Sequence, residues 1–450
     1  MIRTIPKPHQ KDIVLFCAPL EYGAIVAPYG SGKSLSALWL IERMKWNIVI
    51  LVSTKTALES TWEDEIKKHS NFLYAHVVGD LRQKIYIIRA ALSRHKASNQ
   101  TLVLLVNFDG VKNILDSLAA LKPDAVIADE SLQFKNPDTL RSKVMWALSR
   151  AVPKRFLLAG NIFSESLTEV YSQVKYLDRG ATFGNSYKQF LKDHFEKKKN
   201  KYVPKKGMTQ KIFKLIRPFT TSVPENVIQR PPAIPKKIGL HPTAQQRDLL
   251  DKLKNDFKLE LGKVHVDITS IYALVGKCQQ ICDGFITDNH GNIVYIDTPK
   301  DEALIDELEE IGRHEKVIVW AYHKPVIKKL YRILTKLGYG VLVINGETKD
   351  SGVLVRQFQN SNRYNIFLLS LKKANSSITV TNSRCALYYS QSWSFNEMDN
   401  SHARNRRIGS EKHDSIMYGY FYLKDTVSEQ IYNCWITKGD LVKTLRKYFK

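Results

Sequence analysis

The sequence predicts an α/β protein of two lobes, each built on a parallel β-sheet. In the first half of the chain, short apolar runs alternate with amphipathic stretches, which is typical of parallel strands joined by crossover helices. The same alternation returns in the second half, and a basic, proline-rich segment lies between the two halves. No tandem repeat is recognisable, so the two similar lobes are predicted from this pattern alone.

The positions of the apolar runs give the expected elements. The expected strands of the first half are residues 23–27, 47–53, 101–107, 125–128 and 155–159, and helical patterns cover 35–44 and 57–69. The expected strands of the second half are residues 316–321, 340–344, 365–369, 385–390 and 415–423, and helical patterns cover 324–337 and 353–360.

The segment between the halves changes in composition. Residues 195–207 form a weakly periodic lysine run, and residues 224–235 are rich in proline, which favours an extended, semi-rigid connector. The lysine run is either a solvated surface loop or a contact that follows a phosphate backbone. We therefore expect a first lobe over 1–180, a basic helical insertion and proline-rich linker over 181–235, and a second lobe over 236–450.

The bulk composition is that of a globular protein, with 44% hydrophobic and 10% aromatic residues among 450. No apolar run reaches the roughly 18 residues of a membrane span, and the N-terminus lacks a secretory signal. Five cysteines, an odd number, do not suggest a disulfide framework, and Cys278 and Cys282 lack the second ligand pair of a zinc site. We expect a cytoplasmic protein (in the host cytoplasm if it is viral) without a membrane partner.

The net charge is +24, from 68 Lys and Arg against 44 Asp and Glu. A charge excess of this size attracts polyanions. It fits either a basic protein without a specific partner or a nucleic-acid-binding protein, and the motifs that follow favour the second interpretation.

A phosphate-binding loop follows the first expected strand and opens a helix. Its residues are Ala27, Pro28, Tyr29, Gly30, Ser31, Gly32, Lys33 and Ser34. Backbone N–H groups of residues 30–33 would surround a phosphate, Lys33 would contact the β- and γ-phosphates, and the Ser34 hydroxyl would bind Mg²⁺. The strict pattern has glycine where Ala27 stands, but the close approaches need only Gly30 and Gly32.

Two further motifs carry charges that suit such a site. Asp129 and Glu130 end an apolar run, so Asp129 can hold Mg²⁺ and Glu130 can polarise the attacking water. Residues 400–409 predict a helix that Gly409 ends, with Arg404 and Arg407 on one face. These guanidiniums are either arginine fingers that reach the γ-phosphate or an exposed basic helix end.

In this order, the motifs resemble superfamily-two helicases, especially the Swi/Snf-type DNA-dependent ATPases and, among them, branch-migration DNA helicases of tailed bacteriophages. The resemblance runs from Pro8 to about Tyr432. It rests on Pro8-His9-Gln10, on residues 50–58 followed by Trp62 and Glu65, on the acidic box 129–136 with its Lys135-Asn136 ending, and on the arginine motif with Trp393 upstream.

The resemblance implies two RecA-like lobes with the ATP site in the cleft between them, and DNA lying across both lobes. It makes Gln10 the adenine-recognising residue, and it makes Arg404 and Arg407 arginine fingers. The implied cofactors and partner are ATP, Mg²⁺ and DNA, and the expected form is a monomer. The implied DNA contacts are Lys55, Thr56, Asn107, Gly346, Thr348 and Thr381.

Some residues depart from the family pattern. Ser131-Leu132 stands where the acidic box has Ala-His, and Ala159-Gly160-Asn161 replaces the threonine-bearing triplet of the coupling motif. The glycines expected near 374–381 are missing, with Asn375, Ser376 and Ser377 in that stretch, and Asn400 replaces the glutamine that opens the arginine motif. These departures suggest a divergent, compact, viral member of the family.

The resemblance implies a helicase that unwinds forks or migrates four-way junctions in replication, recombination or repair. The alternatives are a duplex DNA translocase without strand separation, an RNA helicase, and a non-hydrolysing, nucleotide-gated DNA-binding scaffold. Lys135-Asn136 and Trp393 favour DNA over RNA, whereas the altered coupling motifs keep the scaffold open. A small-molecule kinase would not need the second lobe with its distal arginines.

Overall fold

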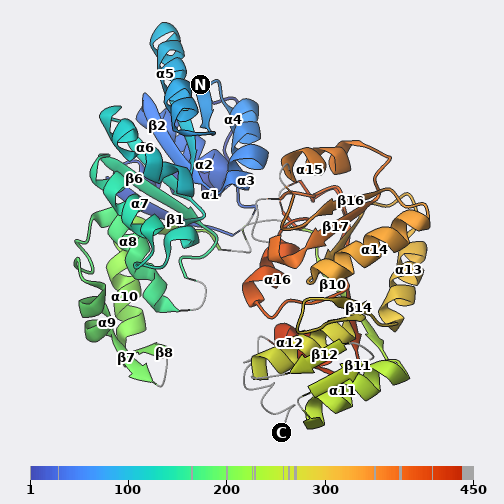
Figure 1. Ribbon diagram of the computed structural model, residues 1–450. Helices are drawn as coiled ribbons and strands as arrows, with labels where there is room; N and C mark the ends of the chain where they lie inside the picture. The colour runs from blue at the N-terminus through green and yellow to red at the C-terminus, as the bar shows by residue number, and fades with distance from the viewer. Residues whose placement is uncertain are drawn as a thin grey trace. The chain divides into compact units, whose positions relative to one another are not determined.

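The computed structural model describes residues 2–28, 30–163, 166–198, 201–224, 227, 230–256, 258–261, 264–267, 271–348, 351–373, 378–407 and 409–437. The chain divides into two compact units, Met1–Gln229 and Arg230–Lys450, called lobe one and lobe two below. In Figure 1 lobe one runs from blue to green, and lobe two from yellow-green to red.

Lobe one is built on a seven-stranded sheet with the order β3-β4-β2-β5-β6-β1-β9 in the described chain. All its strand pairs are parallel, and Ser53 at the end of β2 lies beside Asn107 at the end of β4. The strands are β1 (Tyr22–Val26), β2 (Ile48–Ser53), β3 (Leu73–Val77), β4 (Leu102–Asn107), β5 (Ala125–Asp129), β6 (Lys154–Ala159) and β9 (Thr220–Ser222).

Alternate residues of each strand serve two separate cores, because side chains alternate between the faces of a sheet. Ile50 and Val52 of β2 join the core packed under α5 to α8, whereas Val49 and Leu51 join the core under α1, α2 and α4. The helices are α1 (Pro8–Cys17), α2 (Lys33–Met44), α3 (Lys55–Ala57), α4 (Glu63–His69), α5 (Leu81–Ser98), α6 (Phe108–Ala120), α7 (Leu140–Arg150), α8 (Val170–Asp178), α9 (Tyr187–His194) and α10 (Met208–Ile216).

Between α9 and α10, lobe one carries an antiparallel hairpin of β7 (Phe195–Lys198) and β8 (Lys201–Pro204). In Figure 1 the hairpin, α9 and α10 form the green part of lobe one. The chain then returns to the sheet, where β9 pairs with β1.

Lobe two is built on a six-stranded sheet with the order β10-β19-β18-β15-β17-β16 in its described residues. Its strand pairs are also parallel. The strands are β10 (Ala233–Leu240), β15 (Val317–Ala321), β16 (Val341–Ile344), β17 (Ile366–Ser370), β18 (Cys385–Tyr388) and β19 (Ile416–Leu423).

Helices again cover both faces of this sheet. Ile318 and Trp320 pack with α15 to α17, whereas Val317 and Val319 pack with α13 and α14. The helices are α11 (Ala244–Asp256), α12 (Ile271–Cys282), α13 (Pro299–Ile311), α14 (Lys324–Lys336), α15 (Ser351–Asn360), α16 (Phe395–His402) and α17 (Val427–Ile436). Two hairpins complete the lobe: β11 (Lys258–Leu261) with β12 (Val264–Asp267), and β13 (Phe285–Thr287) with β14 (Ile293–Tyr295).

The ten expected strands are confirmed, with ends that shift by one or two residues. The helix expected over 57–69 is confirmed, with a start at Lys55 and a π-helical turn at Leu58–Trp62. Two other expectations are wrong. The lysine run 195–207 is a hairpin rather than a loop, apart from residues 199–200, which lie outside the described chain. The helix expected over 400–409 ends at His402.

The helices and the cysteines were also compared with the expectations for membrane spans and disulfides. No described helix combines the length and the apolar character that a membrane crossing requires. The five cysteines are buried free thiols.

Candidate nucleotide-binding site

The expected site residues of lobe one follow four strands of the parallel sheet at the strands' carboxyl ends. The phosphate-binding loop follows β1, Lys55 and Thr56 follow β2, Asn107 ends β4, and Asp129 ends β5. Because all these strands run in the same direction, their carboxyl ends share one edge, where ligands bind in open α/β sheets. The fold therefore brings these residues to one edge of lobe one.

The phosphate-binding loop has a backbone that requires glycine at two positions. Gly30 and Gly32 have φ angles of 76° and 78°, in the left-handed region that glycine adopts without steric cost. Gly32 is the N-cap of α2, so the first N–H groups of that helix are available to an anion. Tyr29 lies outside the described residues.

The polar side chains of the loop fit a phosphate. The Lys33 Nζ donates to the Ala27 and Pro28 carbonyl oxygens, at 2.7 and 3.2 Å, so it arches over the loop. The Ser31 hydroxyl is buried and has no hydrogen-bond partner among the described residues. A buried polar group without a partner calls for a missing one, and a phosphate oxygen supplies it. Ser34 stands in the first turn of α2, partly exposed.

Asp129 is the carboxylate that closes this site. It accepts hydrogen bonds from the Trp62 indole at 2.8 Å, from the Ser53 hydroxyl at 3.3 Å and from the Glu130 N–H at 2.9 Å. Burial raises the pKa of Asp129 above its ordinary value, although the Trp62 hydrogen bond and the Lys33 charge oppose this rise. A divalent cation would compensate the buried negative charge, so the residues present fit Mg²⁺.

Trp62 and Ser53 belong to segments that carry the family resemblance, but their hydrogen bonds to Asp129 were not predicted. Trp62 is fully buried in the π-helical turn, and Ser53 is the last residue of β2. The available signal was chemical, because a buried indole N–H needs an acceptor. Both residues connect the segment that carries the expected DNA contacts Lys55 and Thr56 to the Asp129 carboxylate.

Gln10 lies against the phosphate-binding loop. Its amide nitrogen donates to the carbonyl oxygens of Ser31 and Gly32, both at 3.3 Å, and its amide oxygen accepts from the Lys7 N–H at 2.8 Å. The neighbouring His9 imidazole is 2.9 Å from the Ser31 carbonyl oxygen. Gln10 therefore supports the loop, and its recognition of adenine stays a prediction.

The acidic box and the coupling motif are connected by buried hydrogen bonds. The Ser131 hydroxyl donates to the Gln173 amide oxygen at 2.5 Å, and the Gln173 amide nitrogen donates to the Ile162 carbonyl at 2.6 Å. Lys135 forms an ion pair with Glu169 at 2.8 Å. Ser131 departs from the family pattern, but its side chain still forms a hydrogen bond, to Gln173.

The expected DNA contacts of lobe one have different surroundings. Lys55 is exposed and lies 3.7 Å from Glu59, whereas Thr56 is partly buried. Asn107 precedes α6, and its side chain lies so close to Gly110 that a Cβ there would meet its amide oxygen at 2.2 Å. Their roles toward DNA stay predictions.

The two arginines of lobe two do not lie on one helix face, because α16 ends before them. The Arg404 carbonyl accepts from the Val380 N–H at 2.9 Å, which takes it out of a helical hydrogen-bond ladder. The Arg404 side chain is 2% exposed and donates to the Asn400 and Ile378 carbonyls at 2.8 and 3.4 Å. The Arg407 guanidinium is partly exposed and donates to the Thr379 hydroxyl at 2.8 Å.

The expected DNA contacts of lobe two stand in loops. Gly346 and Thr348 belong to the turn after β16, where the Thr348 hydroxyl accepts from the Asn345 N–H at 3.0 Å. Thr381 precedes β18, and its carbonyl oxygen is 2.9 Å from the His413 imidazole. Asn375, Ser376 and Ser377 lie outside the described residues.

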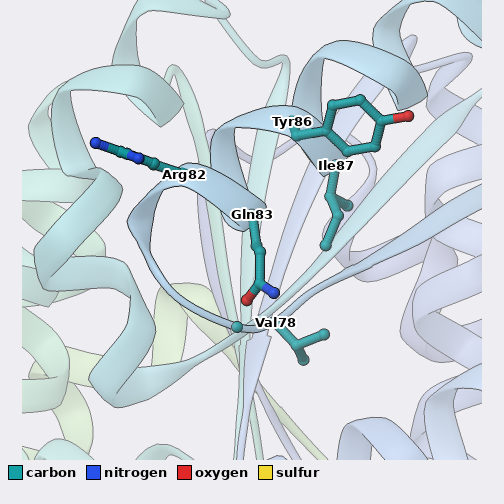
Figure 2. Close-up of a pocket in the computed structure, with 6 residues that line it drawn as sticks. Val78, Arg82, Gln83, Tyr86 and Ile87 are labelled. Carbon is teal, nitrogen blue, oxygen red and sulfur yellow. The ribbon is translucent and has the colours of Figure 1, made fainter.

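A hollow of about 470 Å³ opens elsewhere on lobe one, between the end of β3 and the start of α5 (Figure 2). It is lined by Val78, Gly79, Arg82, Gln83, Tyr86 and Ile87. None of the expected site residues lines it, so it is separate from the phosphate-binding loop.

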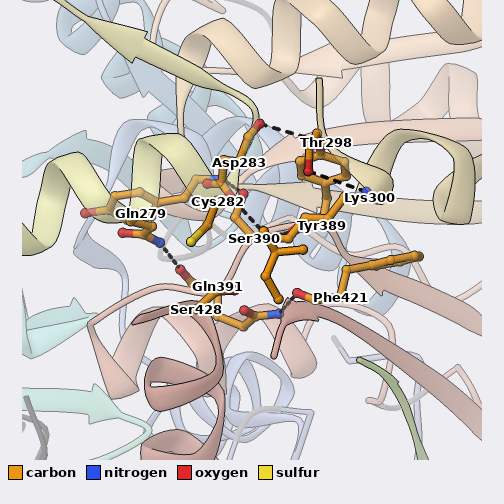
Figure 3. Close-up of polar contacts among 12 residues, drawn as sticks. Gln279, Cys282, Asp283, Thr298, Lys300, Tyr389, Ser390, Gln391, Phe421 and Ser428 are labelled. Atoms are coloured by element: carbon orange, nitrogen blue, oxygen red, sulfur yellow. Dashed lines mark hydrogen bonds and ion pairs between the residues drawn. The ribbon is translucent and has the colours of Figure 1, made fainter. Parts of the chain in front are cut away.

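Lobe two contains a buried polar network that ties α12 to the end of β18 (Figure 3). Lys300 forms a fully buried ion pair with Asp283 at 2.9 Å. Burial alone would raise the pKa of Asp283, but Lys300 and the hydrogen bond from His323 hold it below its ordinary value. The Gln279 amide donates to the Gln391 carbonyl at 2.8 Å and accepts from the Trp393 indole, upstream of the arginine motif.

Two RecA-like α/β lobes, with a phosphate-binding loop and an acidic residue at the sheet edge of the first, define an ATPase of helicase superfamily two. The SNF2-related domain model matches residues 23–284, more than half of the chain, and the helicase conserved C-terminal domain model matches residues 299–409. The chain therefore belongs to the SNF2-related family, a family of DNA-dependent ATPases.

Similar proteins come from animals, a phage and an archaeon. A SWI/SNF-related matrix-associated actin-dependent regulator of chromatin subfamily A-like protein 1 homolog of Caenorhabditis elegans is 22% identical over 97% of this chain, which spans 61% of that protein. Protein p41 of Acyrthosiphon pisum secondary endosymbiont phage 1 is 24% identical, over 74% of this chain and 75% of its own length. The solved SWI2/SNF2 ATPase core of Sulfolobus solfataricus in complex with dsDNA is 18% identical over 98% of this chain and 95% of that one, with a TM-score of 0.45.

Proposed function

We propose that the chain is an ATP-dependent DNA helicase or translocase that acts on branched DNA in replication, recombination or repair. The proposal is carried by three features of lobe one: the Ser31 hydroxyl has no partner among the described residues, Lys33 donates to the Ala27 carbonyl of the loop, and the Lys33 charge acts on Asp129. These groups suit a phosphate and Mg²⁺. The proposal is also supported by the match of lobe two to a helicase C-terminal domain and by the charge of +24.

Lobe one supplies the groups that hold ATP. The N–H groups of residues 30–33 and the Lys33 ammonium bind phosphate oxygens, so Lys33 exchanges the Ala27 and Pro28 carbonyls for phosphate. Ser34 and Asp129 would hold Mg²⁺, which would neutralise negative charge on the bound phosphates. Glu130 orients the attacking water and accepts its proton.

Lobe two supplies the arginines. Arg404 is 2% exposed, so its guanidinium would have to become accessible to act as a finger, whereas Arg407 is already partly exposed. Closing and opening of the lobes in each ATP cycle then moves the protein along a strand. The contacts go mainly to phosphates, so binding has little sequence preference and weakens with salt.

The test is ATP hydrolysis without DNA and with single-stranded, duplex, forked and four-way DNA. We expect forked and four-way DNA to stimulate hydrolysis most, and Lys33→Ala to lower it by about 10²-fold or more, since it removes a charge that stabilises the transition state. Lys11→Ala is the control, because Lys11 is an exposed lysine on α1. An absence of DNA stimulation, or an active Lys33→Ala variant, would contradict the proposal.

The same measurements separate the alternatives. Stimulation by duplex DNA without strand separation indicates a translocase. Stimulation by RNA in preference to DNA indicates an RNA helicase. Nucleotide-dependent DNA binding without phosphate release indicates a scaffold.

A further inference from the structure

The strongest concentration of charge in the sequence lies outside the ATP site. Residues 187–217, which contain α9, the β7–β8 hairpin and α10, carry eleven Lys and Arg against two Asp and Glu. This segment, called the basic module below, is therefore a small part of the chain that contributes a net charge of +9 to the total of +24.

Most of the cations whose side chains are described have no partner among the described residues. Lys198 pairs with Glu196 at 2.7 Å, and Lys205 donates to the carbonyl oxygens that end α9. Within the described chain, seven exposed side chains make no ion pair or hydrogen bond: Lys188, Lys192, Lys197, Lys206, Lys211, Lys214 and Arg217. Clustered like charges repel one another, so this surface gains most from a polyanion.

The module has an apolar base that holds these cations in place. Phe190 is 1% exposed, and its ring packs against those of Tyr171, Phe183 and Phe195 at centroid distances of 5.1, 4.9 and 5.4 Å. Ile212 and Ile216 of α10 are buried one turn apart. The lysines therefore project from a packed element.

Apolar side chains are exposed among the lysines. Tyr202 is 42% exposed and lies opposite Lys197 in the hairpin, and Phe213 of α10 is 40% exposed. Lysines that bind phosphates beside an aromatic ring that stacks on a base are the combination that binds single-stranded nucleic acid. An intact duplex offers the lysines its phosphates but offers Tyr202 no unstacked base.

The module is also connected to the ATP-binding edge of lobe one. The Phe213 ring lies 6.1 Å from that of Phe163, two residues after Asn161 of the coupling motif. At its other end, the chain enters β9, which pairs with β1, the strand that leads into the phosphate-binding loop. The module therefore packs against the segment after the coupling motif and leads into a strand beside the one that precedes the phosphate-binding loop.

We propose that the basic module binds the branch point of DNA, with its lysines on backbone phosphates and Tyr202 stacked on an unpaired base. The proposal rests on the proposed function, because it names the part of lobe one that distinguishes forked from duplex DNA. The ligand is DNA in which a double-stranded backbone continues into a stretch of unpaired bases.

The test measures binding of a labelled forked DNA and of a blunt duplex over a series of salt concentrations. In one variant, Lys206, Lys211 and Lys214 are replaced by Gln. We expect about tenfold weaker fork binding and a salt dependence that is shallower by about 0.9 for each phosphate that is no longer bound. The matched control replaces Arg82, Arg89 and Lys96 by Gln, since these are exposed cations on α5 of the same lobe that make no side-chain hydrogen bond or ion pair in its described part. Figure 2 shows Arg82 at the start of α5.

Tyr202 tests the stacking separately. We expect Tyr202→Ala to lower the fork-to-duplex affinity ratio about tenfold, and Tyr202→Phe to restore it, because phenylalanine keeps the ring. Wild-type fork binding by the lysine variant, an equal loss in the α5 control, or equal losses on fork and duplex in Tyr202→Ala would each overturn the proposal.

Binding is measured without hydrolysis, so the two proposals fail separately. If DNA does not stimulate hydrolysis but the module variants lose fork binding, only the proposed function is wrong. If DNA stimulates hydrolysis and the module variants bind forks as the wild type does, only this inference is wrong.

Discussion

At the scale of single residues, Asp129 shows how a position proposed for catalysis can oppose stability. Its carboxylate is partly buried beside Trp62 and Ser53, and its pKa is raised because burial disfavours the charged form. A group held in this way is suited to a cation that is present only during turnover. Without a bound cation, the charged Asp129 carboxylate lowers the stability of the folded protein.

Asp129→Asn is therefore expected to stabilise the unliganded protein at pH 8 while abolishing hydrolysis. The folded chain keeps the Asp129 proton to a higher pH than the unfolded chain, so the free energy of unfolding falls as pH rises through that range. The loss amounts to about 1.4 kcal/mol for each unit by which the pKa is raised. Denaturant unfolding at several pH values checks this, and the variants should converge as pH falls toward about 4. A variant that is no more stable than the wild type at pH 8 would contradict it.

Trp62→Phe is expected to raise the pKa of Asp129 further, since it removes the indole N–H that favours the charged form. The pH range in which the free energy of unfolding of the unliganded protein falls should then move to higher pH. Trp320→Phe is the matched control, because Trp320 is equally buried but its indole N–H has no partner in the described chain. Identical pH dependences of the free energy of unfolding for the two variants would disprove the role of Trp62.

At the scale of elements, the connection between the acidic box and α8 runs through two buried amide and hydroxyl groups. Ser131 donates to Gln173, which donates to the Ile162 carbonyl beside the coupling motif. The chain therefore has a hydrogen-bonded route between two motifs that both depart from the family pattern. Helix α8 stands at the middle of that route.

Ser131→Ala is expected to lower the free energy of unfolding by about 1–3 kcal/mol, because the buried Gln173 amide oxygen loses its donor. Adding Gln173→Leu removes that acceptor but also removes the donor to the Ile162 carbonyl. The double variant should therefore lose less than the sum of the two single losses, because both single changes remove the Ser131–Gln173 bond. Denaturant unfolding of the single and double variants measures both effects. A double variant less stable than the sum of the single changes would contradict the pairing.

The sequence predicted the elements best where strands are buried on both faces. Strands such as β2 and β4 are continuous apolar runs, and these were recognisable without a structure. The edge strand β9 and the β7–β8 hairpin were missed, because three residues or a lysine run carry no clear period. The end of α16 was misplaced because the hydrogen bond from Val380 to the Arg404 carbonyl joins segments distant in sequence.

The candidate site was predictable to the same extent. Lys33 and Asp129 belong to motifs with fixed local chemistry, so their placement at one sheet edge follows from parallel topology. Trp62 and Gln173 could not be found in this way, since each acts on a partner more than 40 residues away. The burial of Arg404 could not be predicted either, because the prediction placed it on the exposed face of a helix that ends before it.

At the scale of the whole molecule, the two lobes have separate cores and separate weak points. In lobe two, the Asp283–Lys300 pair lies fully buried between α12 and α13. Breaking such a pair by removing one partner leaves a buried charge uncompensated.

Lys300→Met is expected to destabilise lobe two by about 3–5 kcal/mol and to make unfolding biphasic, because lobe one keeps its own core. Lys324→Met is the matched control, since its pair with Glu347 is exposed to solvent and contributes little to stability. Denaturant unfolding, followed by hydrogen exchange of each lobe, distinguishes the two. A single transition shared by both lobes would contradict the expectation.

The five buried thiols can be used to detect the opening of each lobe separately. Cys17 belongs to lobe one, and Cys278, Cys282, Cys385 and Cys434 belong to lobe two. Burial raises the pKa of Cys17 to about 12 and that of Cys385 to about 11, so the reactive thiolate is scarce while the lobes stay closed. An alkylating reagent would therefore add one mass label when lobe one opens and four when lobe two opens. The native cysteines therefore allow the opening rates of the two lobes to be measured separately, without any engineered probe.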